Sequence, residues 1–128
     1  MQLLLYLGGD NQDDKRLEAA VHEVIPESKI ELFKGLDDFR ERLRVPVEPD
    51  SIAVLSVPNR EELQKMQLLR RLLTEIYVVL VIADRKKSTI ELAHLLLPRF
   101  LSRVNSDFTD LKIVLNKMYI NSQHSQFA

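Results

Sequence analysis

Seven consecutive residues, 77–83, are apolar apart from one tyrosine hydroxyl, and this run constrains the fold more than any other feature of the chain. A strand with one exposed face alternates apolar and polar side chains. A run that is apolar throughout indicates a strand buried on both faces. Leu3–Leu7 and Ile52–Val57 follow nearly the same pattern. Such strands are typical of parallel sheets that helices cover on both sides.

Strand and helix patterns alternate along the rest of the chain. Residues 29–34 and 100–104 predict two shorter strands, and apolar residues at helical spacing predict five helices. The helices are expected around Leu17 to end at Pro26, from Leu36 to Leu43, over 61–76, from a capping box of Ser88 and Glu91 to Pro98, and from Ser106 or Thr109 onward.

Five strands alternating with five helices predict a parallel sheet with right-handed crossovers and helices on both faces. We therefore expect an α/β fold, the flavodoxin-like doubly wound (βα)5 three-layer sandwich with a five-stranded sheet in the order 2-1-3-4-5. We expect one domain over residues 1–120 and a flexible polar tail over residues 121–128.

Composition excludes several functional classes. The chain of 128 residues has no cysteine, which excludes disulfides, thiolate metal sites and a cysteine nucleophile. Its net charge of -1 gives no overall field toward nucleic acid or an anionic membrane. The apolar N-terminus lacks the leader and cleavage site of a signal peptide, and no apolar run reaches the roughly 20 residues that span a bilayer. We expect a cytoplasmic protein that binds no membrane and no nucleic acid.

Four short stretches lie where predicted strands meet the loops that follow them. They are Gly8-Gly9-Asp10, Val54-Leu55-Ser56-Val57-Pro58, Ile82-Ala83 and Phe100-Leu101-Ser102-Arg103. With the element order and the length, they make residues 2–120 resemble the receiver domain of two-component response regulators. The resemblance places Ser56 at the phosphoacceptor aspartate, Ile82 at a hydroxyl-bearing residue, Arg103 at a lysine, Phe100 at an aromatic residue, and Gly8-Gly9-Asp10 at an acidic cluster for magnesium.

The chemistry of aspartyl phosphorylation is missing at most of these positions. It needs a carboxylate nucleophile, a divalent cation held by carboxylates, and a cation on the phosphoryl oxygens. Ser56 is a poor nucleophile without a general base, and His22, His94 and His124 are not placed to act as one. The resemblance thus implies a pseudo-receiver that is not an enzyme and has no cofactor, with a degenerate pocket of Gly9, Asp10, Ser56, Ile82, Ala83, Asp84 and Arg103.

Other interpretations of the acidic and glycine residues stay open. Asp10 and Asp84 could bind a cation and Arg103 an anion at the carboxyl edge of the sheet, which would switch the domain by a ligand. The pair Gly8-Gly9 could hold an anion, although a tight turn with positive φ is favoured.

A flavodoxin-like cofactor binder is a third reading of the fold. The run from Gly8 to Asp14 is acidic and would repel a cofactor phosphate, which counts against that reading. Asp13 and Asp14 are assigned to the start of the first helix, where the helix dipole favours anions. The basic runs Arg70-Arg71 and Arg85-Lys86-Lys87 are assigned to solvated helix ends and loops.

The fourth predicted helix is more apolar than one core-facing stripe requires. Surplus apolar surface indicates a partner or self-association, and receivers commonly use the face of the fourth helix, fifth strand and fifth helix for this purpose. We therefore predict a signalling or regulatory protein-interaction module that acts without phosphorylation, as a homodimer or with a protein partner. Its predicted interaction face consists of Ile90, Leu92, Leu95, Leu96, Phe100 and Tyr119.

Overall fold

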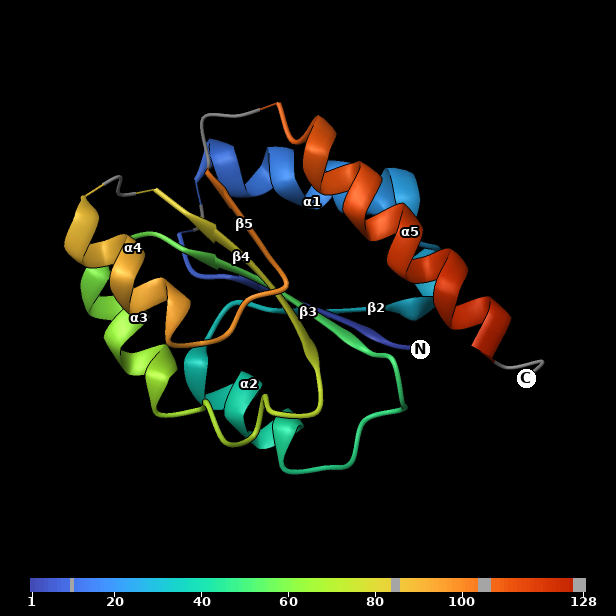
Figure 1. Ribbon diagram of the computed structural model, residues 1–128, viewed down its shortest axis with the longest axis horizontal. Helices are drawn as coiled ribbons and strands as arrows, with labels where there is room; N and C mark the ends of the chain where they lie inside the picture. Colours follow the sequence, from blue (N-terminus) through green and yellow to red (C-terminus); the bar gives the residue numbers. More distant parts are fainter. Residues whose placement is uncertain (10, 84–85, 104–106, 126–128) are drawn as a thin grey trace.

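A computed structural model describes residues 1–9, 11–83, 86–103 and 107–125. Strands and α-helices alternate through this part of the chain, as predicted (Figure 1). The strands are β1 (Leu3–Leu7), β2 (Ile30–Phe33), β3 (Ile52–Val57), β4 (Tyr77–Ile82) and β5 (Phe100–Arg103). The helices are α1 (Gln12–Val24), α2 (Leu36–Leu43), α3 (Arg60–Gln67), α4 (Lys87–His94) and α5 (Thr109–Ser125), with a short 3-10 helix at Glu27–Lys29.

The five strands form one parallel sheet in the order β2-β1-β3-β4-β5, which confirms the predicted flavodoxin-like, doubly wound arrangement. Figure 1 shows α1 and α5 on one face of the sheet and α2, α3 and α4 on the other. Because all strands run in the same direction, their carboxyl ends meet at one edge and their amino ends at the opposite edge.

Alternation along the buried strands divides the core into two layers. On the side of α2, α3 and α4 the central strands contribute Leu4, Tyr6, Leu55 and Leu80. On the side of α1 and α5 they contribute Leu3, Leu5, Val54 and Val79. The apolar runs that predicted the sheet are therefore apolar because each strand supplies both layers.

The third helix is shorter than predicted. It ends at Gln67, and residues 68–75 continue as turns joined by i to i−3 hydrogen bonds, such as Leu69 N–H to the Met66 carbonyl at 2.9 Å. Leu69 and Leu73 are buried on the α2–α4 side of the sheet in spite of this change. The tighter turns bury the same leucines as a helix would, so apolar spacing could not distinguish the two.

The ends of α4 and α5 also differ from prediction. The capping box at Ser88 and Glu91 is wrong, because α4 begins at Lys87 and Lys86 in the cap position makes no side-chain hydrogen bond to it. The helix ends at His94, before Pro98. At the C-terminus α5 continues to Ser125, beyond the start of the predicted tail, although residues 126–128 lie outside the described residues.

Across the described residues, no helix combines the length and apolar character needed to cross a membrane.

Candidate functional site

Two loops at the carboxyl edge start their helices with the same kind of cap. Asn11 Oδ1 accepts a hydrogen bond from the Asp14 backbone N–H at 3.0 Å, and Asn59 Oδ1 accepts one from the Glu62 N–H at 2.8 Å. Each cap satisfies an amide that the first turn of a helix leaves unpaired. The caps thereby fix the side chains of Asp14 and Glu62 relative to the ends of β1 and β3.

A buried hydrogen-bonded pair joins β3 to α1 at this edge. Ser56 Oγ donates to Asp14 Oδ1 at 2.5 Å, and the Gly9 backbone N–H donates to Asp14 Oδ2 at 2.7 Å. Ser56 is 2% exposed and Asp14 is 3% exposed. A carboxylate is buried at low cost only when donors satisfy its oxygens, and hydrogen bonds to an ionised group are the stronger kind. The hydroxyl at the predicted phosphoacceptor position therefore points its proton into the protein.

Close packing explains the two glycines better than backbone angles do. Neither Gly8 nor Gly9 has a positive φ, so the expected turn geometry is wrong. A Cβ at Gly8 would lie 3.0 Å from the Ser56 carbonyl oxygen, and one at Gly9 would lie 3.0 Å from Asp14 Oδ2. The Gly8 N–H donates to that Ser56 carbonyl at 3.0 Å. Both amides are used inside the protein, which leaves neither for the anion considered from the sequence.

Tyr6 and Glu62 form a second polar pair on the other side of the sheet. The Tyr6 hydroxyl donates to Glu62 Oε1 at 3.5 Å. Burial of the phenol, followed by the charge of Glu62, raises the pKa of Tyr6 to about 12. Glu62 Oε2 is buried without a hydrogen-bond partner among the described residues. Glu62 also borders an open depression between α2 and α3, which is lined by Gly35, Leu36, Asp37, Asp38, Glu62 and Lys65.

Strand register separates several of the predicted pocket residues. Ser56 pairs with Val81, whereas Ile82 pairs with Val57 and is buried in the layer of α2, α3 and α4. Ser56 and Ile82 thus point to opposite faces of the sheet. Arg103, which is exposed, pairs with Ile82 on β5, so β4 lies between it and Ser56. Ala83 is exposed just after β4.

The predicted cation ligands Asp10 and Asp84 lie outside the described residues, so the predicted cation site stays a prediction. Among the residues that are described, no three histidine, aspartate or glutamate side chains gather in a way that could hold a metal ion.

The predicted interaction face is only partly a surface. Leu95 is 52% exposed, whereas Leu96 is buried in the core, which corrects its assignment to the face. Ile90 and Leu92 pack partly buried against the layer of α2, α3 and α4. Phe100 and Tyr119 pack partly buried against the layer of α1 and α5. These side chains therefore flank the β5 edge of the sheet from two sides.

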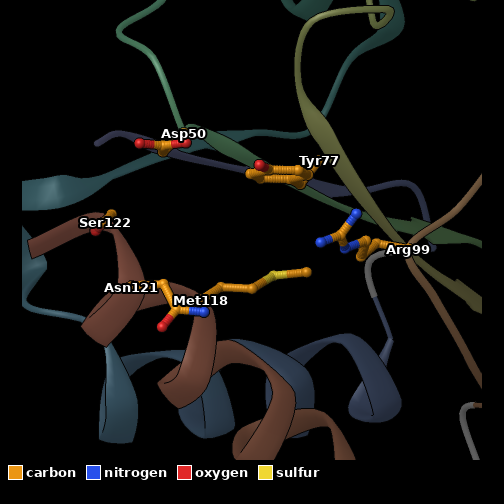
Figure 2. Close-up of a pocket in the computed structure, with 6 residues that line it drawn as sticks. All are labelled: Asp50, Tyr77, Arg99, Met118, Asn121 and Ser122. Carbon is orange, nitrogen blue, oxygen red and sulfur yellow. The ribbon is translucent and has the colours of Figure 1, made fainter. Parts of the chain in front are cut away.

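A cavity that the sequence did not predict lies at the amino edge of the sheet. It has a volume of about 240 Å³ and is lined by Asp50, Tyr77, Arg99, Met118, Asn121 and Ser122. Figure 2 shows the Tyr77 ring and the Met118 side chain on opposite sides of the space. The Arg99 guanidinium lies 4.8 Å from the centre of the Tyr77 ring, a cation–π contact. The residues that line the cavity come from four segments far apart in the sequence, so no local sequence motif predicts it.

No protein-family model matches the chain, and no curated protein is significantly similar to it in sequence.

Proposed function

We propose that this chain is a receiver-like signalling or regulatory interaction module that acts without aspartyl phosphorylation. The observation that supports it best is the buried Ser56–Asp14 pair. Phosphoryl transfer to a receiver requires a solvent-accessible carboxylate that a metal ion and the phosphodonor can both reach. Here the equivalent position carries a hydroxyl that donates to an internal carboxylate, and both groups are buried.

The interaction part of the proposal uses the face formed by α4, β5 and α5. Leu95 is the exposed apolar side chain of the predicted set, and Ile90, Leu92, Phe100 and Tyr119 are partly buried against the two core layers. A second copy of the chain or another protein could bind this face without any chemical change at Ser56.

The test compares the wild-type chain with Ser56→Asp in magnesium and a small phosphodonor, with intact mass as the measurement. We expect no labelling of either protein. In Ser56→Asp the new carboxylate would face Asp14 in a buried site, where two like charges so close cannot both stay ionised without cost. Ser56→Asn is the matched control, since it has the same size without the charge.

Amide NMR gives the second measurement. We expect magnesium and beryllofluoride, a mimic of an acyl phosphate, to leave the Gly9, Ser56 and Arg103 amides unshifted. Saturable shifts in the wild-type chain would instead favour the alternative in which a ligand switches the carboxyl edge. Magnesium-dependent labelling of the wild-type chain or of Ser56→Asp would refute the proposed loss of phosphorylation.

A further inference from the structure

Exposed leucines gather on the two segments that follow α3 and end α4. Among the described residues, nine large apolar side chains are exposed, and four of them lie in residues 68–75 and 94–99. These four are Leu68 at 82%, Leu72 at 37%, Leu95 at 52% and Leu97 at 83%. An exposed group of apolar side chains on a small protein indicates a site of interaction.

The two segments meet in space. Gln67 Nε2 donates to the Leu92 carbonyl at 2.8 Å, which ties the end of α3 to α4, and Figure 1 shows these helices side by side. Between the segments lies a cavity of about 90 Å³, lined by Arg70, Leu73, Thr74, Ile76, Leu96 and Leu97. Leu97 therefore stands at the rim of a small, largely apolar cavity.

Leu97 has a backbone conformation that leucine rarely adopts. Its φ is 53°, in the left-handed region that favours glycine after a helix, and its N–H donates to the His94 carbonyl at 3.0 Å. The side chain gains almost no burial in return, because it is 83% exposed. A leucine under strain and open to water is explained if a partner buries it.

The charge of the two segments indicates the chemistry of that partner. Residues 68–75 and 94–99 contain Arg70, Arg71 and Arg99 against one acidic residue, Glu75, in a chain with 19 acidic and 18 basic residues. Arg99 stacks on Tyr77, whereas Arg70 and Arg71 extend into solvent on the segment that borders the cavity. Complementary charge on a partner would be carboxylates.

We propose that Leu68, Arg70, Arg71 and Leu97, here called the leucine–arginine patch, bind a partner segment that carries aliphatic side chains beside carboxylates. An aliphatic side chain would contact Leu97 and the cavity, and the carboxylates would pair with Arg70 and Arg71. A second copy on the same patch is disfavoured, because a two-fold contact would bring the arginines of both copies together. This inference rests on the proposed interaction role. It names a second surface, beside the ends of α3 and α4 and distinct from the face of α4, β5 and α5, and the chemistry of its partner.

The test titrates the full chain with a panel of fluorescent helical peptides that present leucines at i, i+3 and i+4 spacing flanked by glutamates. The control panel replaces each glutamate with lysine. We expect saturable binding of glutamate peptides alone, with amide shifts at Leu68, Arg70 and Leu97. Leu97→Gly should weaken binding at least about tenfold, as loss of a hot-spot side chain does.

Two further variants separate binding from folding. Leu97→Gly also relieves the left-handed backbone, so its Tm should be unchanged or higher, and weaker binding could not come from unfolding. Ile113→Ala removes an exposed side chain on α5 and should leave binding unchanged. Arg70→Glu should weaken the binding of the glutamate peptides and strengthen the binding of the lysine peptides.

Three results would overturn the inference. No peptide binds, both panels bind equally well, or Leu97→Gly binds as tightly as the wild-type chain. Concentration-dependent dimerisation that Leu97→Gly abolishes would also overturn it, because a second copy would then be the occupant. None of these results changes the magnesium and beryllofluoride titration that is followed at the Gly9 and Ser56 amides. Failure of the patch can therefore be distinguished from failure of the proposed function.

Discussion

A single serine determines how the carboxyl edge of the sheet is hydrogen-bonded beside β1 and α1. Ser56 supplies a donor where the resemblance expects a carboxylate, and Asp14 from α1 supplies the buried acceptor. Gly9 approaches closely enough for its amide to satisfy the second oxygen. These hydrogen bonds stabilise the junction of β1, β3 and α1.

Ser56→Ala tests how much this pair contributes to stability. The buried Asp14 carboxylate would lose a donor, and hydrogen bonds to charged groups contribute about 1.5–3 kcal/mol. We expect the free energy of unfolding, measured by urea denaturation, to fall by about that amount. Ser88→Ala, an exposed serine in α4, should change it by less than about 0.5 kcal/mol. Equal effects of the two substitutions would contradict a structural role for the pair.

Among the elements, the sequence predicted strands better than helix ends. The buried strands have unbroken apolar runs, and β3 lies over the predicted residues. Helix boundaries depend on caps. The caps of α1 and α3 follow the patterns N-x-x-D at Asn11 and N-x-x-E at Asn59, which differ from the capping box predicted for the fourth helix. In α1 this pattern predicts that the Asp14 backbone N–H is capped by Asn11, which fixes the position of Asp14. The helix dipole predicts only that an acidic residue lies near the start of the helix.

Element order alone predicts which residues of the predicted pocket lie near the ends of the strands, but not which of them contact one another. The positions of Ser56 and Gly9 at the carboxyl edge follow from element order, and the structure brings these two together through Asp14. Strand register, which separates Ile82 from Ser56, is set by pairing across the sheet and has no local sequence signal. The amino-edge cavity is built from segments far apart in the chain, so it too could not be predicted locally.

At the level of packed elements, one ion pair ties the edge strand β2 to α2. Arg42 donates from Nε to Glu31 Oε1 at 2.8 Å and from Nη2 to Oε2 at 3.1 Å. These hydrogen bonds are the largest cause that lowers the pKa of Glu31 below its ordinary value of 4.5. A lowered pKa means stabilisation that is present above pH 4.5 and is lost as the pH falls through the pKa of the folded state.

Glu31→Gln should therefore be less stable than wild type at pH 7 by about 0.5–1 kcal/mol, because the pair is partly exposed and screened. The difference should narrow at acid pH, as urea denaturation at pH 7 and pH 3 can measure. Glu41→Gln is the matched control, since its pair with Arg44 at 3.2 Å is largely exposed, and we expect no measurable change. A Glu31→Gln effect of the same size at both pH values would show that the charge is not responsible.

On the scale of the whole molecule, the last turns of α5 decide where the domain ends. The sequence predicted a domain over residues 1–120, but Ser122 is buried and its Oγ donates to the Tyr119 carbonyl at 2.7 Å. Asn121 and Ser122 also line the amino-edge cavity beside Tyr77 and Arg99. Ser122 thus belongs to the packed structure through both burial and hydrogen bonding, although it lies beyond residue 120.

Two truncated chains test this boundary. A chain that ends at Ser125 keeps the described length of α5 and should unfold in urea within about 0.5 kcal/mol of the full chain. A chain that ends at Ile120 loses the buried Ser122 and uncovers Met118 and Tyr119, which pack against the layer of α1 and α5. We expect it to be less stable by about 1–2 kcal/mol, because buried contacts and a hydrogen bond are lost together. If both truncations match the full chain, residues 121–125 are dispensable and the domain ends at residue 120, as the polar composition of the tail predicted.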